Sequence, residues 1–196
     1  MTDFDQFARI VTQTLFFGSL PHWQAEPLRM LIAEGERRNQ SVERIAYVLA
    51  TAHHETRRFR YMEEVGRGEG RLYGKPIRLI DSRKATFHGR GFVQLTWLAN
   101  YAKMSLYLTQ EHGREIDLVN NPDLAEAPAV SSLIIWEGMV RGMFTGRSLA
   151  DYISGTNADY VGARRIVNGT DRAEQIAEYA RLFEAALKSA RQDVAA

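Results

Sequence analysis

The sequence predicts a mainly α-helical protein that forms a single domain over residues 1–196, built either as one body or as two lobes. Apolar residues recur at three- and four-residue steps along most of the chain, which is the spacing of one helix face. The length and the 45% hydrophobic content are ample for a core. We find no internal repeat, low-complexity block or linker that would divide the chain.

Two helices are expected before residue 40. Phe4–Leu15 carries an apolar stripe that Gly18 and Pro21 bring to an end. Trp23–Arg38 is the second helix, in which Pro27 is tolerable only in the first turn. We interpret both helices as scaffold.

A third helix, Ser41–Arg57, carries the carboxylate of greatest interest. Ser41 is a good N-cap, and an apolar stripe follows at helical spacing. At about 100° per residue, Glu55 points away from that stripe. This acid is therefore free to face a cleft.

A second carboxylate, Glu64, follows at the end of the run Phe59–Glu64. One helix through both acids would turn Glu55 and Glu64 about 180° apart. The glycines at 66, 68 and 70 instead indicate that the helix stops near Arg57 and the chain folds back, so that the two acids lie on facing segments. Two carboxylates across a groove suit glycosidic bond hydrolysis. The alternative is that both are solvated surface acids.

The stretch from 77 to 97 combines a short strand with a glycine-containing run. Ile77–Ile80 is expected to be extended. Glycines flank Arg90, which suits a tight bend or a backbone that lies close to something bound. If the following residues are extended, Gln94 and Thr96 face one way and offer an amide and a hydroxyl to one ligand. Otherwise they are a polar pair satisfied by backbone groups.

The C-terminal part is expected to be helical again. Ala129–Met143 is apolar nearly all round and predicts a central buried helix. Within it, Glu137 is placed to pair with Arg141 one turn later, with a catalytic role as the alternative. Asp171 and Glu174 have capping-box spacing for the last helix.

Composition excludes several classes of function. The net charge of +1 gives no case for nucleic-acid binding, and the absence of cysteine excludes disulfides and thiol chemistry. His53-His54-Glu55 lacks the i, i+4 histidine spacing of a zinc protease, so we expect no metal and no cofactor. Arginines nevertheless cluster beside the expected cleft, where they are either a solvated face or a means of attracting an anionic polymer. They are Arg57, Arg58, Arg60, Arg67 and Arg71.

Three stretches together resemble the family 19 glycoside hydrolases, the chitinases and the related phage and bacterial endolysins. They are His-Glu-Thr at 54–56, Gly-Arg-Gly-Phe-Val-Gln-Leu-Thr-Trp at 89–97 with Asn-Tyr at 100–101, and Ile-Val-Asn-Gly at 166–169. The similarity spans roughly Ile45–Leu187. It implies a lysozyme-like, two-lobed helical fold with a small β-hairpin element beside the active-site cleft.

The resemblance also implies roles for individual residues. Glu55 matches the family's general acid, Glu64 the general base of the endolysin branch, and Thr96 the residue that holds the attacking water. Glu63 rivals Glu64, because a one-residue shift in an extended segment exchanges their faces. The substrate-binding residues expected on this basis are His54, Gln94, Trp97, Asn100, Asn168 and Arg172.

The implied function is inverting hydrolysis of β-1,4 bonds in an N-acetylglucosamine-containing polymer. We favour an endolysin-type muramidase acting on peptidoglycan, because the arginine cluster suits lactyl and peptide carboxylates; a chitinase is the alternative. A lytic transglycosylase and a non-catalytic glycan-binding module remain as other classes. No signal peptide or apolar run long enough to span a membrane is present. We therefore expect a monomer made in the cytoplasm without membrane insertion, which reaches the cell wall or periplasm by an outside route.

Overall fold

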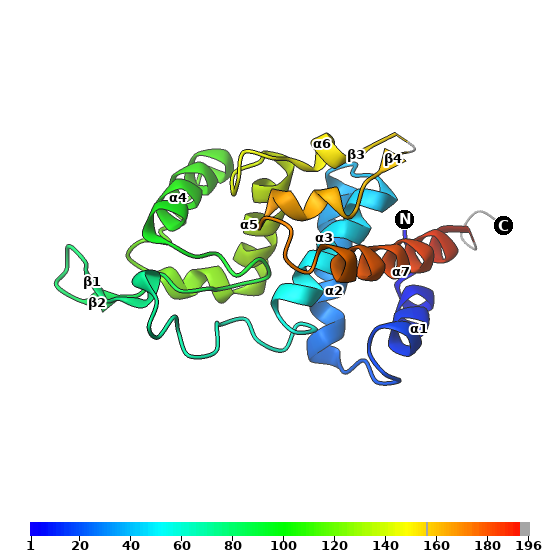
Figure 1. Ribbon diagram of the computed structural model, residues 1–196, viewed down its shortest axis with the longest axis horizontal. Helices are drawn as coiled ribbons and strands as arrows, with labels where there is room; N and C mark the ends of the chain where they lie inside the picture. The colour runs from blue at the N-terminus through cyan, green and yellow to red at the C-terminus, as the bar shows by residue number, and fades with distance from the viewer. Residues whose placement is uncertain (156, 193–196) are drawn as a thin grey trace. The chain divides into compact units, whose positions relative to one another are not determined.

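The computed structural model describes residues 1–155 and 157–192 and is mainly helical, as the sequence predicts. These residues contain seven α-helices and two small antiparallel sheets of two strands each, labelled in Figure 1. The chain divides into two compact units. One consists of Met1–His54 with Trp136–Ala196, and the other of Glu55–Ile135. The organisation as a single domain stays a prediction.

The first unit joins helices from both ends of the chain. Its elements are α1 (Phe4–Thr14), α2 (His22–Arg37), most of α3 (Val42–Glu55), α6 (Leu149–Tyr152), β3 (Ile153–Ser154), β4 (Asn157–Ala158), η3 (Gly162–Ile166) and α7 (Ala173–Gln192). Phe7 of α1 stacks on Phe183 of α7, with 6.2 Å between ring centroids. Trp136 packs so closely on α2 that a Cβ at Gly35 would lie 2.6 Å from its ring. These contacts build a core from the predicted apolar stripes.

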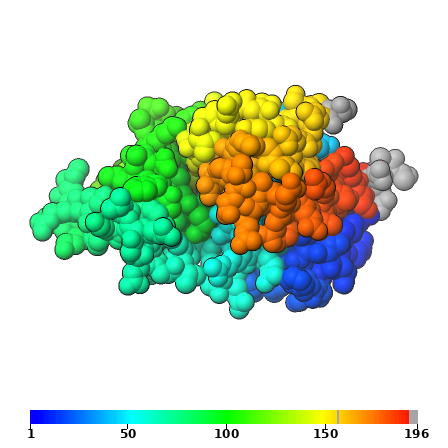
Figure 2. All heavy atoms as spheres, viewed as in Figure 1, coloured from blue at the N-terminus to red at the C-terminus, as the bar shows by residue number. Residues whose placement is uncertain are grey.

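The second unit holds the segments that follow α3. Its elements are η1 (Leu72–Gly74), β1 (Ile77–Arg78), β2 (Lys84–Ala85), α4 (Leu98–His112), η2 (Pro122–Glu126) and the first part of α5 (Pro128–Val140). The expected strand at Ile77–Ile80 is confirmed as β1, although it ends at Arg78. β1 and β2 form an antiparallel hairpin in which Ile77 pairs with Ala85. Figures 1 and 2 show this hairpin projecting from the rest of its unit.

The end of α3 is set by its backbone conformation. The helix ends at Glu55, two residues before the predicted end, and Arg57, Arg58 and Phe59 all have positive φ. Three consecutive residues in the left-handed region cannot continue a right-handed helix. The Thr56 side chain stabilises the turn, because its hydroxyl accepts a hydrogen bond of 2.8 Å from the Phe59 N–H. The predicted stop and fold-back after the helix are thus confirmed.

Two details of the helix predictions are wrong. α2 begins at His22, so Pro27 lies in its second turn rather than its first. The last helix begins at Ala173, and the Arg172 carbonyl accepts the first helical bond from the Ile176 N–H. Asp171 therefore lies one residue outside the N-cap position, and its spacing to the next acid has no capping-box role.

Glu137 is a structural residue, as expected. It is 3% exposed and pairs with Arg141 at 2.9 Å and also with Arg38. A buried carboxylate held by two guanidinium groups is stabilised in its charged form. The alternative catalytic role is therefore not supported by its surroundings.

Gly91 is required by its backbone and by its neighbours. Its φ is +75°, and an added Cβ would lie 2.4 Å from the Ala125 carbonyl oxygen and 2.5 Å from the Ser131 hydroxyl. We expect Gly91→Ala to lower the free energy of unfolding by about 3 kcal/mol, through overpacking and strain. Gly70→Ala is the matched control, because Gly70 has φ +76° with no atom within 4 Å of the added Cβ. It should cost only about 1 kcal/mol. Equal losses in urea titrations of the two variants would contradict the packing argument.

Candidate active site

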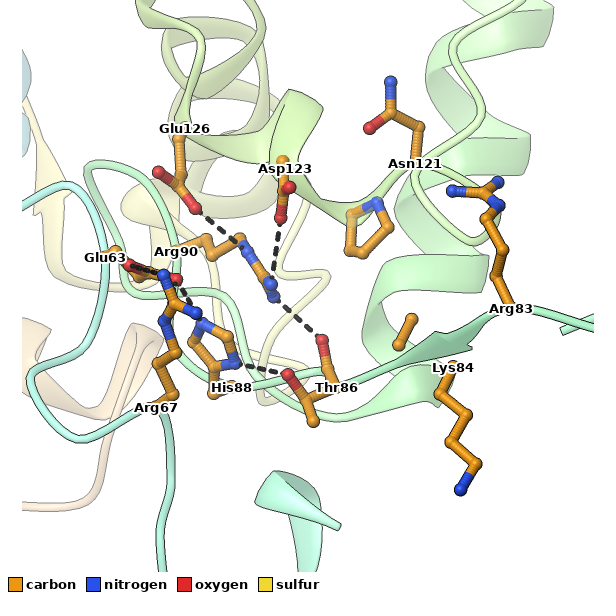
Figure 3. Close-up of a pocket in the computed structure, with 12 residues that line it drawn as sticks. Glu63, Arg67, Arg83, Lys84, Thr86, His88, Arg90, Asn121, Asp123 and Glu126 are labelled. Atoms are coloured by element: carbon orange, nitrogen blue, oxygen red, sulfur yellow. Dashed lines mark hydrogen bonds and ion pairs between the residues drawn. The ribbon is translucent and has the colours of Figure 1, made fainter. Parts of the chain in front are cut away.

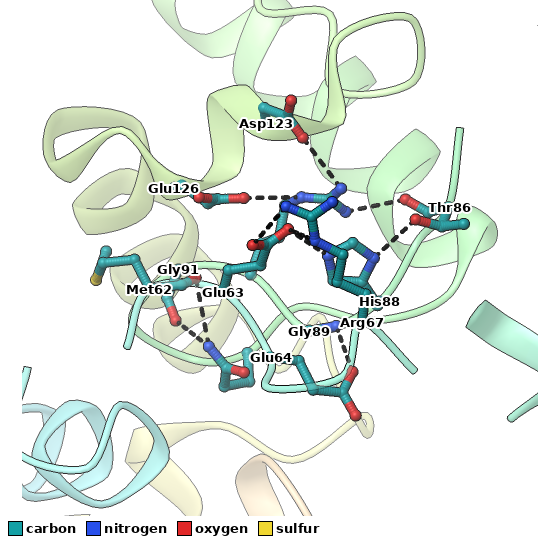
Figure 4. Close-up of polar contacts among 12 residues, drawn as sticks. Met62, Glu63, Glu64, Arg67, Thr86, His88, Gly89, Gly91, Asp123 and Glu126 are labelled. Atoms are coloured by element: carbon teal, nitrogen blue, oxygen red, sulfur yellow. Dashed lines mark hydrogen bonds and ion pairs between the residues drawn. The ribbon is translucent and has the colours of Figure 1, made fainter. Parts of the chain in front are cut away.

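Glu63 and Glu64 lie on an extended segment that pairs with the residues around Arg90. The Glu64 N–H donates to the Gly89 carbonyl at 2.8 Å, and Met62 accepts from the Gly91 N–H at 2.7 Å. Successive side chains on an extended segment point to opposite sides. Figure 4 accordingly shows the two carboxylates directed away from each other. The two acids therefore occupy different surroundings.

Glu64 is held by two neutral hydrogen-bond donors. The Tyr73 hydroxyl donates to one carboxylate oxygen at 2.9 Å, and the Gly89 N–H donates to the other at 3.0 Å. Burial and the bond to Glu64 raise the pKa of Tyr73, so this hydroxyl keeps its proton. Glu64 forms no ion pair with any residue that the structure describes. Its carboxylate is thus fixed in position without a neutralising cation.

Gln94 lies beside Glu64, but not in the predicted conformation. A Cβ at Gly89 would approach the Gln94 side-chain oxygen to 2.8 Å and the Glu64 Cβ to 3.3 Å, so both side chains flank this glycine. Gln94 has φ +50°, within the turn that links Arg90 to Leu95. The expectation of an extended segment is therefore wrong. The Gln94 amide nitrogen donates to the Gly91 carbonyl at 3.1 Å. This agrees with the alternative in which backbone groups satisfy the Gln94 side chain.

Thr96, Trp97 and Asn100 follow directly after this turn. Trp97 is 47% exposed and its ring meets the Tyr73 ring edge-on, with 5.4 Å between centroids. The Asn100 side chain donates to the Thr96 carbonyl at 2.9 Å. The half-buried Thr96 hydroxyl makes no hydrogen bond to another residue in the described ranges. Tyr73 therefore links Trp97 to Glu64, and the hydroxyl of Thr96 is available to a water or a ligand.

Glu55 is the last residue of α3 and is half-buried. It immediately precedes the turn in which three consecutive residues, 57–59, have positive φ. Such strain clusters at functional sites, where the surrounding structure holds a side chain in a required place. Phe59, 4% exposed, anchors the turn by packing edge-on against Phe92 at 5.9 Å. The acid thus lies at a well-fixed point of the chain.

Three of the predicted substrate-binding residues belong to the first unit. His54 is half-buried in the last turn of α3. Asn168 and Arg172 are exposed, the former after η3 and the latter at the start of α7 with φ +57°. The residues that the second unit brings together are Glu64, Gln94 and Trp97.

Glu63 belongs to a separate charged network. Its carboxylate accepts from Arg67 at 2.9 Å and lies 3.0 Å from the His88 ring nitrogen. Burial opposes ionisation of Glu63, but these two partners outweigh it and lower the pKa of Glu63. Burial and the nearby Arg90 lower the pKa of His88, so the ring is kept neutral. Glu63 is therefore an ionised carboxylate whose charge is balanced by Arg67. A carboxylate with a lowered pKa is a weak base and is poorly suited to take a proton from water.

Sequence reasoning missed two partners of Glu64. Tyr73 was not predicted, because nothing in its spacing links it to residue 64. Gly89 carried a usable signal, since a glycine before Arg90 already indicated a close approach of the backbone. What approaches is the side-chain pair of Glu64 and Gln94.

Comparison with known proteins supports the fold. No protein-family model and no curated protein sequence matches the chain. Among solved structures it is similar to chitinase C from Streptomyces griseus, with 20% identity, a TM-score of 0.63, and coverage of 95% of this chain and 76% of that one. It is also similar to a single-residue mutant of chitinase C, with 19% identity, a TM-score of 0.54, and coverage of 95% and 92%. The protein therefore has the fold of these chitinases, and the predicted helical fold with a small hairpin is confirmed.

Two further findings concern the described residues. They contain no group of three or more acidic, histidine or cysteine side chains that could hold a metal ion. Nor does any described helix have the length and apolar content needed to cross a membrane.

Proposed function

We propose that the protein is a glycoside hydrolase of the family 19 type that cleaves β-1,4 bonds in the glycan of peptidoglycan. The observation that carries the proposal is the setting of Glu64, a carboxylate held by two neutral donors in a fold shared with chitinases. Glycoside hydrolysis needs a second acid across the bond, and Glu55 supplies it.

The reaction is a single displacement with inversion. Glu55, in its protonated form, donates its proton to the departing glycosidic oxygen. Glu64 takes a proton from a water held by Thr96, and the water attacks the opposite face of the sugar. This mechanism requires carboxyl groups about 6.5–9.5 Å apart, which leaves room for the water. In this mechanism the hydrogen bonds from Tyr73 and Gly89 orient the Glu64 carboxylate toward the attacking water.

The glycan is argued from charge. Peptidoglycan and chitin share the N-acetylglucosamine unit, but only peptidoglycan carries lactyl and peptide carboxylates. The exposed arginines at 57, 58, 60, 67 and 71 lie along the segments on either side of Glu64 and complement those groups. Chitin is the second candidate, because both similar structures are chitinases. Action on peptidoglycan would place the protein at the cell wall. We also propose that it acts as a monomer.

Product analysis tests this proposal. Purified sacculi and chitin oligomers are digested separately, and new reducing ends and their anomeric form are measured by NMR. We expect faster release from sacculi, with the α-anomer formed first. Anhydro-sugar ends would indicate a lytic transglycosylase, and binding without any release would indicate a glycan-binding module. Either result would overturn the proposal, and faster release from chitin would select the second candidate.

A further inference from the structure

The second unit contains a polar cavity on the Glu63 side of the extended segment, away from the Glu64 carboxylate. Its volume is about 350 Å³, and three segments of the unit line it, as Figure 3 shows. They are the loop from Glu63 to Arg67, the stretch from Arg83 to Arg90, and Asn121 to Glu126. The mechanism proposed above makes no use of this cavity.

The wall of the cavity is rigid and charged. Arg90, 4% exposed, binds Asp123 and Glu126 at 3.0 Å each and donates to the Thr86 carbonyl at 2.9 Å. His88, 1% exposed, lies 2.8 Å from the Thr86 hydroxyl. Since both buried side chains are fully engaged, the wall is a preformed surface.

Groups of both signs remain available at the cavity. Arg67 pairs with Glu63 at 2.9 Å, and Arg83 pairs with Asp81 at 2.6 Å and donates to the Asn120 carbonyl at 3.0 Å. Both side chains remain largely exposed, at 71% and 62%, so a ligand can reach them. Glu63 and Glu126 each keep 30% of the side chain exposed. Burial, followed by the negative charge of Glu63, raises the pKa of Glu126. A cationic group bound between these two acids would relieve their repulsion.

A second hollow lies beside this cavity and is lined in part by Glu64. It has a volume of about 430 Å³ and follows the segment from Arg60 to Arg67, including Glu64. It shares Glu63, Arg67 and Glu126 with the first cavity. The two hollows therefore adjoin at these three residues, between Glu64 and the first cavity.

We infer that the cavity is a subsite for the peptide branch of peptidoglycan, a short chain that carries both carboxylate and ammonium groups. The carboxylates pair with Arg67 and Arg83, and the ammonium group lies between Glu63 and Glu126. This inference rests on the proposed function and adds the means by which the protein selects a peptide-bearing glycan over chitin, which has no such branch.

Binding of a soluble branch tests the subsite without catalysis. The probe is the tripeptide Ala-γ-Glu-diaminopimelate, titrated into the protein by NMR or calorimetry. Arg83→Gln should weaken binding about tenfold, as expected for one charge-assisted hydrogen bond, and Arg83→Lys should restore part of it. Arg78→Gln is the matched control, because Arg78 is exposed on the same hairpin and does not line the cavity. Asn121→Ala, at a lining residue outside the hairpin, provides a second variant should Arg83→Gln loosen the hairpin.

Turnover separates this inference from the proposed function. Intact sacculi should be cleaved at least tenfold faster than glycan stripped of peptide by an amidase, and Arg83→Gln should remove most of that preference. If the stripped glycan is cleaved as fast and the tripeptide does not bind, the subsite is refuted while the hydrolase stands. If the tripeptide binds but no glycan is cleaved, the hydrolase is refuted and the subsite stands.

Discussion

Replacing Glu55 with glutamine is expected to abolish glycan hydrolysis and leave the fold intact. Glutamine has the shape of glutamate but carries no proton that it can donate to a leaving oxygen. General acid catalysis contributes about 10²- to 10⁴-fold, so kcat on sacculi should fall by about 1,000-fold or more. Because Glu55 is at the very end of α3 and half-buried, the change should cost little stability.

The control for this experiment is Glu69→Gln. Glu69 is an exposed acid in the loop after Glu64, so its replacement makes the same chemical change without touching the site. Far-UV circular dichroism and thermal unfolding should be unchanged in both variants, and only Glu55→Gln should lose activity. Full activity in folded Glu55→Gln would end its assignment as the acid.

Most of the fold follows from local signals in the sequence. The apolar stripes predicted α1, α3 and α5 to within a few residues, because a helix that must bury one face repeats every 3.6 residues. Helix starts were less predictable. Pro21 and Arg172 precede α2 and α7, and neither forms a side-chain cap that spacing would reveal. The left-handed residues 57–59 carry no glycine, so sequence could indicate the stop but not its geometry.

The candidate site was predictable only where its residues are neighbours in sequence or share a motif. Alternation along an extended segment already implied that Glu63 and Glu64 face opposite ways. The surroundings of each acid are set by residues distant in sequence. His88 lies beside Glu63, whereas Tyr73 and Gly89 donate to Glu64. These partners lie 9 to 25 residues away in sequence. Their pairing is a property of tertiary structure, which a single sequence does not encode in any local spacing.

The second large effect on activity is expected at Glu64, the acid chosen as the base over Glu63. We expect Glu64→Gln to lower kcat by about 100-fold or more, because the amide cannot take a proton from water. The side chain should stay in place. Its oxygen can still accept from the Gly89 N–H, and its NH₂ group can donate to the Tyr73 hydroxyl, which serves as donor or acceptor.

Glu63→Gln is the matched variant one residue away. It removes the ion pair with Arg67, which is exposed and therefore contributes little stability. The glutamine oxygen can still accept a hydrogen bond from the buried His88 ring, and the surroundings of Glu64 are unchanged. Activity on peptide-free glycan should stay within a few-fold of the unmodified protein. Single-turnover measurements on both variants decide the assignment, because a base is needed in the chemical step itself. If Glu63→Gln is the variant that loses activity, Glu63 is the base. The hydrogen bonds from Tyr73 and Gly89 to Glu64 then have a structural role only.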